Sequence, residues 1–411
     1  MEDYAKKEKK IDRVIEKSIL IFIFFLPFFT PLAYLALIIA LVYWLHKVKL
    51  RKLLNVEPKI FGFALLGLTF AALLSVVFSV DKPFSLGCFG LYLFYPSVCL
   101  LMIDSVGNSI KVEKILQVII LSGIIVVSFG IIQFLTKFEF EFHKYFLNIN
   151  ITSKGGITST WSNPNRFAKY LDLVLPLSFV YLLTQKELKK KVLLTVFIGL
   201  GLVCIVLTRS LGGMAAVFAV LVILFAIKNW KLCLIFLVIF FFFVVFNYSW
   251  LINIANRYGS AGLRFFTWKN VVLPIIKDHP ITGSGLGTYA EISYKYSHAI
   301  KAVHSHAHSI YFNYLSELGI LGFGMLLWII IIFFRSSTTY LRKHSFFVAQ
   351  GIIAGCFLSI FSAMIHGVVE TFVDYFQLGL LFWLIIGLGL GTMRFHASHK
   401  QSPIEEKNQY E

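Results

Sequence analysis

Residues 18–45 read SILIFIFFLPFFTPLAYLALIIALVYWL, a run of 28 positions without a charged side chain. An apolar stretch of about 20 residues is long enough to span a bilayer as a helix. Pro27 and Pro31 interrupt this run, and basic residues flank it at positions 6–10 and 47–52. Because cytoplasmic segments collect Lys and Arg, both flanks belong on one side, so the run crosses an even number of times. We therefore predict two short helices joined near Pro27–Pro31.

The rest of the chain has the same apolar character. Its 411 residues are 58% hydrophobic and only 14% charged, against about 45–50% and 25% in soluble domains. The long apolar runs lack the alternation of barrel strands. We predict an all-α polytopic membrane protein, a single integral membrane domain over residues 1–411 with about twelve transmembrane helices. The further apolar segments are 60–80, 84–103, 115–136, 167–184, 192–207, 211–227, 232–252, 309–334, 346–366 and 375–393.

The net charge of +17 fits membrane topology better than nucleic-acid binding, because the charges lie between the apolar segments. In the twelve-span arrangement the cytoplasmic pieces hold 25 of the 38 Lys and Arg residues, as the positive-inside rule requires. Both termini are then cytoplasmic. The five cysteines all lie in apolar stretches without metal-ligand spacing, so we interpret them as small core residues.

Two loops are predicted to face outward, at about 137–166 and 253–308. A loop as long as the second is usually functional or disordered, and its aromatic residues and periodic apolar positions favour a folded segment against the membrane. Within it, residues 263–276 (LRFFTWKNVVLPII) have the pattern of an amphipathic helix lying in the membrane interface.

Arginine residues near the outer face are candidates for binding an anion. Arg209, in the sequence Thr208-Arg209-Ser210-Leu-Gly-Gly213, lies at the end of a predicted span, where an Arg is costly unless it faces water or an anion. The small residues beside it would let an anionic group approach both the Arg and a helix N-terminus. The alternative is an Arg that extends to lipid headgroups.

The long outer loop is itself basic, with Arg257 and Arg264 among its six cations and only Asp278 and Glu291 as acidic residues. Arginine binds phosphate with two parallel hydrogen bonds. The loop therefore suits a lipid-linked phosphate or diphosphate, and simple adhesion to anionic headgroups is the alternative.

Three histidines follow at the end of this loop, in His304-Ser-His306-Ala-His308-Ser309. Alternating histidines could bind a transition metal, but no acidic or Cys ligand is adjacent in the sequence, so the pattern favours one His as a general base. Nearby, the Gly-rich segment 283–287 lacks the Lys-Ser/Thr of a phosphate loop and is interpreted as a tight turn.

A group of ionisable residues lies in the last external turn. His366, Glu370 and Asp374 fall within nine residues of one another between two apolar segments. Charged residues at a membrane boundary are often merely solvated, so these three are given a secondary role.

Four motifs in this order resemble the O-antigen ligase and polymerase superfamily of bacterial membrane glycosyltransferases. Residues 161–168 contain Asn163-Pro164-Asn165, similar to the family's Asn-Pro-Asn stretch, and residues 208–213 resemble its Ser-Arg-Gly motif with Arg and Ser transposed. Residues 264–287 and 306–322 supply the third and fourth, although His308-Ser309 stands where the family usually has His-Asn. The resemblance covers the chain from about residue 160 onward.

The resemblance implies a GT-C-like fold and a glycan donor on undecaprenyl diphosphate, presented at the periplasmic face of the bacterial inner membrane. In such a protein Arg209 and Arg264 would bind the diphosphate, and His308 would deprotonate the acceptor hydroxyl, which attacks the anomeric carbon with inversion. No metal or cofactor is implied. The expected partners are the lipid-linked donor, lipid A–core or another glycan acceptor, and membrane lipids, with no nucleic acid. Secondary site candidates are His304, His306, Arg257, Asn163, Asn165 and Asp374.

Several functions share these motifs. O-antigen ligation to lipid A–core in lipopolysaccharide biosynthesis is the leading hypothesis, with an O-antigen or capsule polymerase and a protein O-oligosaccharyltransferase as alternatives of the same chemistry. A transporter of a lipid-linked anionic substrate is the alternative from a different class. Transporters often show two similar halves around a midway loop, whereas here the long loop follows the ninth predicted span and the halves are dissimilar.

Overall fold

The computed structural model describes residues 2–47, 59–137, 156–249, 252, 260–297, 306–343, 347–373 and 375–399. Over these ranges the chain is helical, with one isolated bridge between Val106 and Ile110 and no strand. Nine helices in these ranges are long and apolar enough to cross a membrane, and Leu211–Ile227 and Cys233–Phe246 are shorter apolar helices. The all-α membrane class is confirmed, and twelve crossings remain a prediction.

The two helices predicted from residues 18–45 are present. α1 (Glu2–Phe25) and α2 (Thr30–Lys47) pack against each other, and Pro27 lies in the turn between them. Pro31 occupies the first turn of α2, where its missing N–H costs nothing. α1 is not among the nine candidate spans, because only its last eight residues are uncharged.

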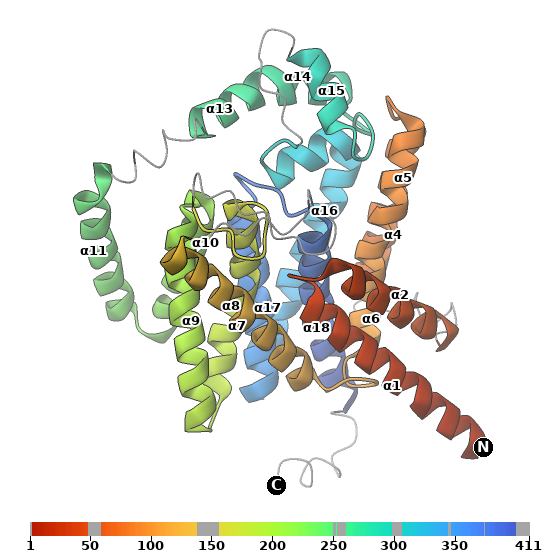
Figure 1. The fold of residues 1–411 in the computed structure, drawn as a ribbon. Coiled ribbons are helices and arrows are strands. Elements are labelled where there is room, and N and C mark those ends of the chain that lie inside the picture. Colours follow the sequence, from red (N-terminus) through yellow and green to blue (C-terminus); the bar gives the residue numbers. More distant parts are fainter. Residues whose placement is uncertain are drawn as a thin grey trace.

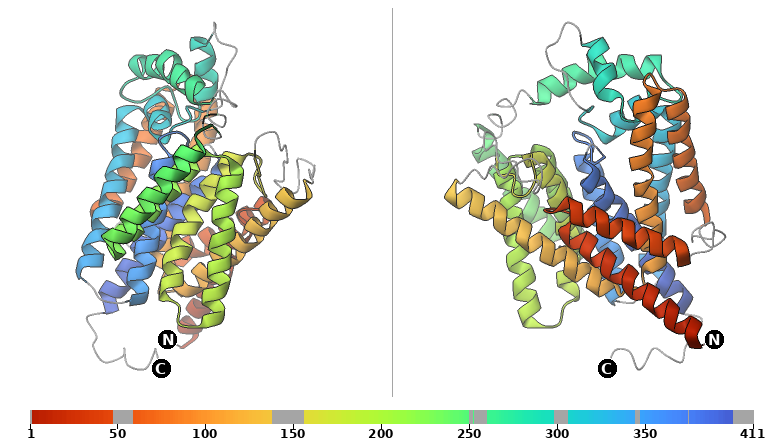
Figure 2. Two further views of the ribbon diagram at one scale, coloured as in Figure 1. Left: turned by 90° about the vertical axis from the view of Figure 1, so that its left-hand side faces the viewer. Right: turned by 45° about the vertical axis from the view of Figure 1, so that its right-hand side comes forward.

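The centre of the helical bundle is built from three helices (Figures 1 and 2). α8 (Pro164–Thr184) packs along α17 (Phe347–His366), and α18 (Phe376–His399) packs against α17 and α6. Their apolar side chains are almost wholly buried. The surrounding helices are α4 (Lys59–Val77), α5 (Lys82–Tyr92), α6 (Phe94–Ser105), α7 (Val112–Thr136), α9 (Leu188–Thr208), α10 (Leu211–Lys228), α11 (Trp230–Phe246) and α16 (Ile310–Lys343).

A layer of short helices covers one end of the bundle, opposite the end where α1 begins and α18 finishes (Figure 1). It consists of α13 (Ser260–Thr267), a π-helical turn (Trp268–Val272), α14 (Leu273–Asp278) and α15 (Tyr289–Tyr296). The helix predicted over 263–276 is therefore confirmed. Val272 and Ile275 pack into a small core with Tyr289 and Ala307, which ties this layer to the start of α16.

The Gly-rich segment 283–287 is a packing turn. Gly283 and Gly285 both have positive φ, and a Cβ on them would collide with the Glu317 backbone and the Ser79 side chain. Only glycine tolerates both the conformation and the close approach. The turn joins α14 and α15 to the α4–α5 junction and to α16.

Candidate functional site

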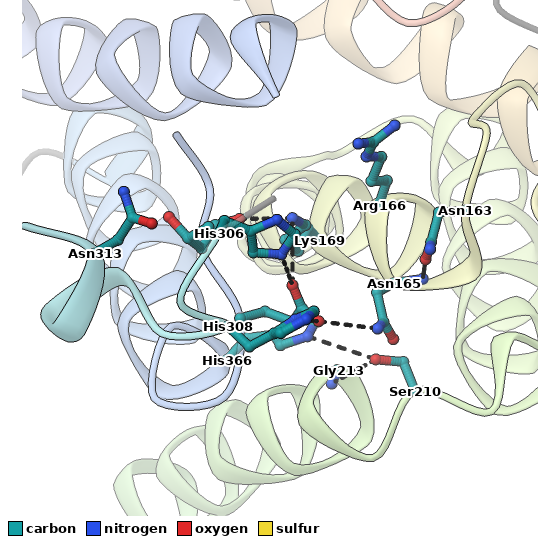
Figure 3. A network of polar contacts seen from close by, with 12 residues as sticks. Asn163, Asn165, Arg166, Lys169, Ser210, Gly213, His306, His308, Asn313 and His366 are labelled. Carbon is teal, nitrogen blue, oxygen red and sulfur yellow. Dashed lines mark hydrogen bonds and ion pairs between the residues drawn. The ribbon is translucent and has the colours of Figure 1, made fainter. Parts of the chain in front are cut away.

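The polar site at the covered end of the bundle is organised around Glu370. This residue lies in the turn between α17 and α18 and is only 3% exposed. Its carboxylate contacts residues from α8, α13 and the segment before α16, and Figure 3 shows several of them converging. We call this group the Glu370 cluster: Asn165, Lys169, Arg264, His306, His308 and Glu370.

Helix α8 contributes to this cluster through one face. Asn163 caps the helix by accepting a hydrogen bond from the backbone N–H of Asn165 (2.8 Å), with Pro164 in the first turn. Asn165 Nδ2 donates to Glu370 Oε1 (3.0 Å). One turn later the buried Lys169 Nζ lies 3.9 Å from Glu370 Oε2 and donates to the Thr371 carbonyl. The Asn-Pro-Asn motif thus begins the helix and places Asn165, in the first turn, in contact with Glu370.

The segment before α16 supplies the imidazoles. His308 Nδ1 lies 3.2 Å from Glu370 Oε1, and His306 Nε2 lies 3.5 Å from Oε2. The two rings are 4.3 Å apart, centroid to centroid. Between them, the Ala307 carbonyl accepts a hydrogen bond from Trp268 Nε1 (2.7 Å) and its N–H donates to Asn313 Oδ1 (3.3 Å). The outer layer and α16 therefore hold both histidines against Glu370.

His308 and Arg209 are two of four non-glycine residues with positive φ in the described ranges, at 48° and 59°. Such a conformation costs of order 1–3 kcal/mol and persists only where the surroundings enforce it. After His308, the Ser309 carbonyl and hydroxyl accept the first backbone hydrogen bonds of α16. Ser and Asn are both good N-caps, so the replacement of the family's His-Asn by His308-Ser309 preserves this start of the helix.

A second polar chain lies beside the cluster and links α8, α17 and α10. Asp172 Oδ2 lies 2.5 Å from His366 Nδ1, and His366 Nε2 lies 3.5 Å from Ser210 Oγ. Ser210 caps α10, and Gly212 lies so close to His366 that a Cβ would meet the ring at 2.5 Å. The small residues of the Ser-Leu-Gly-Gly segment are thus needed for α10 to approach α17.

Arg209 lies at the corner between α9 and α10, next to Ser210. Its side chain is half-buried. It has no hydrogen bond or ion pair within the described part of the chain, in contrast to Arg264, whose Nη2 donates to Glu370 Oε1 at 2.8 Å. The two arginines predicted to act together therefore differ, because only the Arg264 side chain pairs with an acidic residue in the described part of the chain.

The electrostatics of the cluster favour an anion. Burial raises the pKa of Glu370, but the hydrogen bonds from His306 and His308 and the charge of Lys169 outweigh it, so this pKa lies well below its ordinary value. Glu370 is therefore an anion flanked by the permanent cation Arg264 and by Lys169. One negative charge between two positive ones leaves the site net positive.

The cluster also contains a set of residues that could hold a metal ion. One ligand atom each from His306, His308 and Glu370 lies within 4.8 Å of the others, a pattern of two imidazoles and one carboxylate that transition metals accept. Arg264 and Lys169 contact the same carboxylate. A dication there would stand beside two cations, which disfavours a metal.

A cavity of about 310 Å³ has His306 in its wall. Its walls come from α5, α6, the Gly-rich turn, α16 and the start of α18. The lining residues are Cys88, Leu91, Tyr92, Tyr95, Leu286, Gly287, His306, Asn313, Tyr314, Glu317, Leu318, Val373 and Phe376.

The structure brings four of the predicted site residues together around Glu370, namely Asn165, Arg264, His306 and His308. Arg209 lies at the neighbouring corner, and Asn163 acts as a helix cap. Three predicted site residues lie outside the described residues: His304, Arg257 and Asp374.

Sequence reasoning missed Lys169 and Asp172, and it gave Glu370 and His366 only a secondary role. Lys169 and Asp172 are charged residues in an otherwise apolar predicted span, four and seven positions after Asn165. That spacing places all three on one helix face. A charged residue inside a span usually faces the bundle interior, so this signal was present in the sequence.

Apolar helices long enough to cross a membrane, with a buried polar site at one end, define an integral membrane protein with a candidate active site. Residues 194–327 match a family model described as O-antigen ligase, a stretch that includes Arg209, Arg264, His306 and His308. The match supports the O-antigen ligase superfamily, as the motifs indicated, and with it O-antigen ligase-type glycan transfer in general. A comparison with curated proteins gave no match.

Proposed function

We propose that this protein is an inverting, metal-independent glycosyltransferase that moves a glycan from undecaprenyl diphosphate to an acceptor hydroxyl, as an O-antigen ligase acting on lipid A–core. The observation that carries the proposal is the pairing of His308 with the buried anion Glu370 in a net-positive site. The proposal places this site on the periplasmic face of the inner membrane, with both termini cytoplasmic.

In this proposal His308 is the general base. With its Nδ1–H donating to Glu370, the imidazole presents Nε2 as the proton acceptor. A carboxylate on Nδ1 fixes the tautomer and the ring orientation, and it stabilises the imidazolium that forms when the proton is taken. The neighbouring ring of His306, together with the bonds that hold Ala307, restricts movement of the segment.

Arg209 and Arg264 would bind the diphosphate. The Arg209 side chain makes no polar contact in the described part of the chain, and Arg264 uses Nη2 for Glu370. A guanidinium carries five N–H donors, so Arg264 has donors left for a phosphate oxygen. The acceptor oxygen would attack the anomeric carbon as its proton moves to His308. The bond from that carbon to the diphosphate oxygen then breaks, and undecaprenyl diphosphate leaves as an anion stabilised by the arginines.

The function can be tested by deleting the gene in its source organism and analysing lipopolysaccharide on a gel, with lipid-linked glycans extracted in parallel. The proposal predicts loss of the polymer ladder and accumulation of long polymer on undecaprenyl diphosphate, both reversed by the wild-type gene.

A different pattern would reassign the protein. A core carrying one repeat, without accumulated polymer, would indicate a polymerase in place of a ligase. An unchanged ladder together with unchanged lipid-linked glycans would contradict both.

A further inference from the structure

We propose that the cavity beside His306 binds one pyranose ring of the acceptor glycan, an inference that rests on the proposed glycosyl transfer. Its volume of about 310 Å³ is at the lower end of the range for small-molecule pockets, about 300–1,000 Å³. It has room for a single ring and its substituents, and none for a long polymer.

Aromatic side chains form much of the wall. Tyr92, Tyr95, Tyr314 and Phe376 line the cavity, with Tyr92 and Tyr95 in edge contact at 5.7 Å and Tyr95 tilted on Phe376 at 5.5 Å. Aromatic faces are electron-rich, and the C–H bonds on the faces of a pyranose are suited to pack on them. These rings give an apolar wall against which one face of a sugar can pack.

Polar groups in the same wall suit the hydroxyls of a sugar. Glu317 is 8% exposed, and its carboxylate oxygens accept from the Tyr289 backbone N–H and from Asn313 Nδ2, both at 3.2 Å. A carboxylate oxygen has two acceptor positions, and the backbone N–H of Gly287 also donates to this carboxylate, so one acceptor position remains for a sugar hydroxyl. The existing bonds fix the orientation of the carboxylate in the wall.

A hydrocarbon chain fits this wall less well. It would leave the Glu317 carboxylate facing apolar groups, a costly arrangement. The hydroxyls of Tyr92 and Tyr314 are buried and interact with each other in the cavity wall. A hydroxyl has one donor and two acceptor positions, so sugar hydroxyls can add hydrogen bonds to this pair, and an isoprenoid chain cannot.

The cavity also has the position that an acceptor site requires. His306 lines it, and the His306 ring lies 4.3 Å from that of the proposed base His308. A sugar seated on the tyrosines would therefore lie beside His306, the immediate neighbour of the proposed base.

Cys88 provides a direct reporter of occupancy. It lines the cavity and is half-buried, whereas the other four cysteines are buried. The experiment measures the rate at which a membrane-impermeant maleimide labels the purified full-length protein in nanodiscs, with Cys88→Ala as the blank. The probes are the methyl glycosides of glucose, galactose and N-acetylglucosamine, and undecaprenyl diphosphate for comparison.

The proposal predicts that at least one methyl glycoside slows Cys88 labelling threefold or more and that undecaprenyl diphosphate does not. Glu317→Gln, or Tyr314→Phe if the first variant does not fold, should weaken this protection at least threefold. The exposed Glu291 on α15 offers the matched control, since Glu291→Gln should retain full protection.

Three results would overturn the assignment: no labelling of the free protein, no protection by any of the glycosides, or protection by undecaprenyl diphosphate alone. Because labelling needs no catalysis, the two proposals fail separately. Protection without glycan transfer would contradict the proposed function only, and transfer without protection would contradict the sugar site only.

Discussion

Two groups of charged residues lie at opposite ends of this bundle and differ in burial. At the end where the termini lie, Lys47 pairs with Asp12 at 2.5 Å and Arg394 with Asp104 at 3.4 Å, with side chains between 21% and 35% exposed. At the other end, the side chains of Glu370 and Lys169 are 4% and 1% exposed. We call the first group the terminal-end cluster.

This difference in burial suggests two roles for charged residues: those of the terminal-end cluster stabilise the fold, and those of the Glu370 cluster serve function. Ion pairs accessible to solvent stabilise a fold by about 0–1 kcal/mol each. The pairs Lys47–Asp12 and Arg394–Asp104 therefore add modestly to the packing of α1 on α2 and of α6 on α18. Buried charges lose hydration, and an apolar replacement is often at least as stable. Stability alone therefore does not explain the Glu370 cluster, whereas the proposed binding of a diphosphate and activation of a hydroxyl would.

The largest expected effect is on catalysis by the buried carboxylate. Glu370→Gln keeps the shape of the side chain but removes the negative charge that holds His308 and faces Arg264. We expect glycan transfer to fall by about 100-fold or more, measured per mole of purified protein. Asp104→Asn in the terminal-end cluster is the matched control and should change transfer less than about twofold. Equal losses in both variants would remove the distinction between the clusters.

The second-largest effect is expected from removal of an arginine of the proposed diphosphate site. Arg209→Ala should lower kcat/KM for the lipid-linked donor by about 10- to 100-fold, because a charge-assisted contact to the diphosphate is lost. Arg342→Ala, near the end of α16 away from the site, is the control and should behave as wild type. Unchanged donor kinetics in Arg209→Ala would show that Arg209 serves only the fold.

A smaller effect is expected on stability as a function of pH. Glu370 has a pKa well below its ordinary value of 4.5, so its ionised form stabilises the folded protein above about pH 4.5. That contribution is lost as the pH falls through the lowered pKa. The difference in Tm between wild type and Glu370→Gln should therefore shrink below about pH 4.5. A constant difference down to about pH 3 would contradict the assigned charge.

An exposed pair near the terminal-end cluster should matter little. Lys114 and Glu16 are 2.6 Å apart, and the Lys side chain is 51% exposed. Lys114→Ala should reduce the free energy of unfolding by less than about 1 kcal/mol, measured by thermal unfolding in detergent. A loss of several kcal/mol would mean that exposed charges are as important to this fold as buried ones.

Removal of metal ions should have no effect. Because Arg264 and Lys169 already neutralise Glu370, we expect glycan transfer to be unchanged after treatment with EDTA. Loss of transfer that is restored by zinc or manganese would instead assign the set His306, His308 and Glu370 as a metal site.

Much of the fold could be predicted from the sequence, because bilayer thickness and the distribution of Lys and Arg constrain apolar segments strongly. The helix break at Pro27–Pro31 and the helix over 263–276 are examples. Packing was harder to predict: the sequence did not show that Val272 and Ile275 of the helix at 263–276 pack with Tyr289 and Ala307 beside the start of α16. The location of this helix in the membrane interface stays a prediction. A hydrophobic pattern shows which face of a helix is apolar and leaves open what that face contacts.

The candidate site could be predicted only in part. Arg264, His306 and His308 stood out because a basic, histidine-rich outer loop is unusual. Glu370 did not, because its importance comes from partners more than 60 positions away in the chain. Sequence spacing alone cannot show that such distant residues converge on one carboxylate.

The most direct test of the central claim is a single-turnover assay with purified protein, a glycan on undecaprenyl diphosphate and a lipid A–core acceptor. The measurement compares wild type with His308→Ala, and with His279→Ala as a control histidine at the end of α14. We predict that His308→Ala loses transfer by about 100-fold or more while donor binding persists, and that His279→Ala retains it. Transfer by His308→Ala at the wild-type rate would contradict the assignment of His308 as the base.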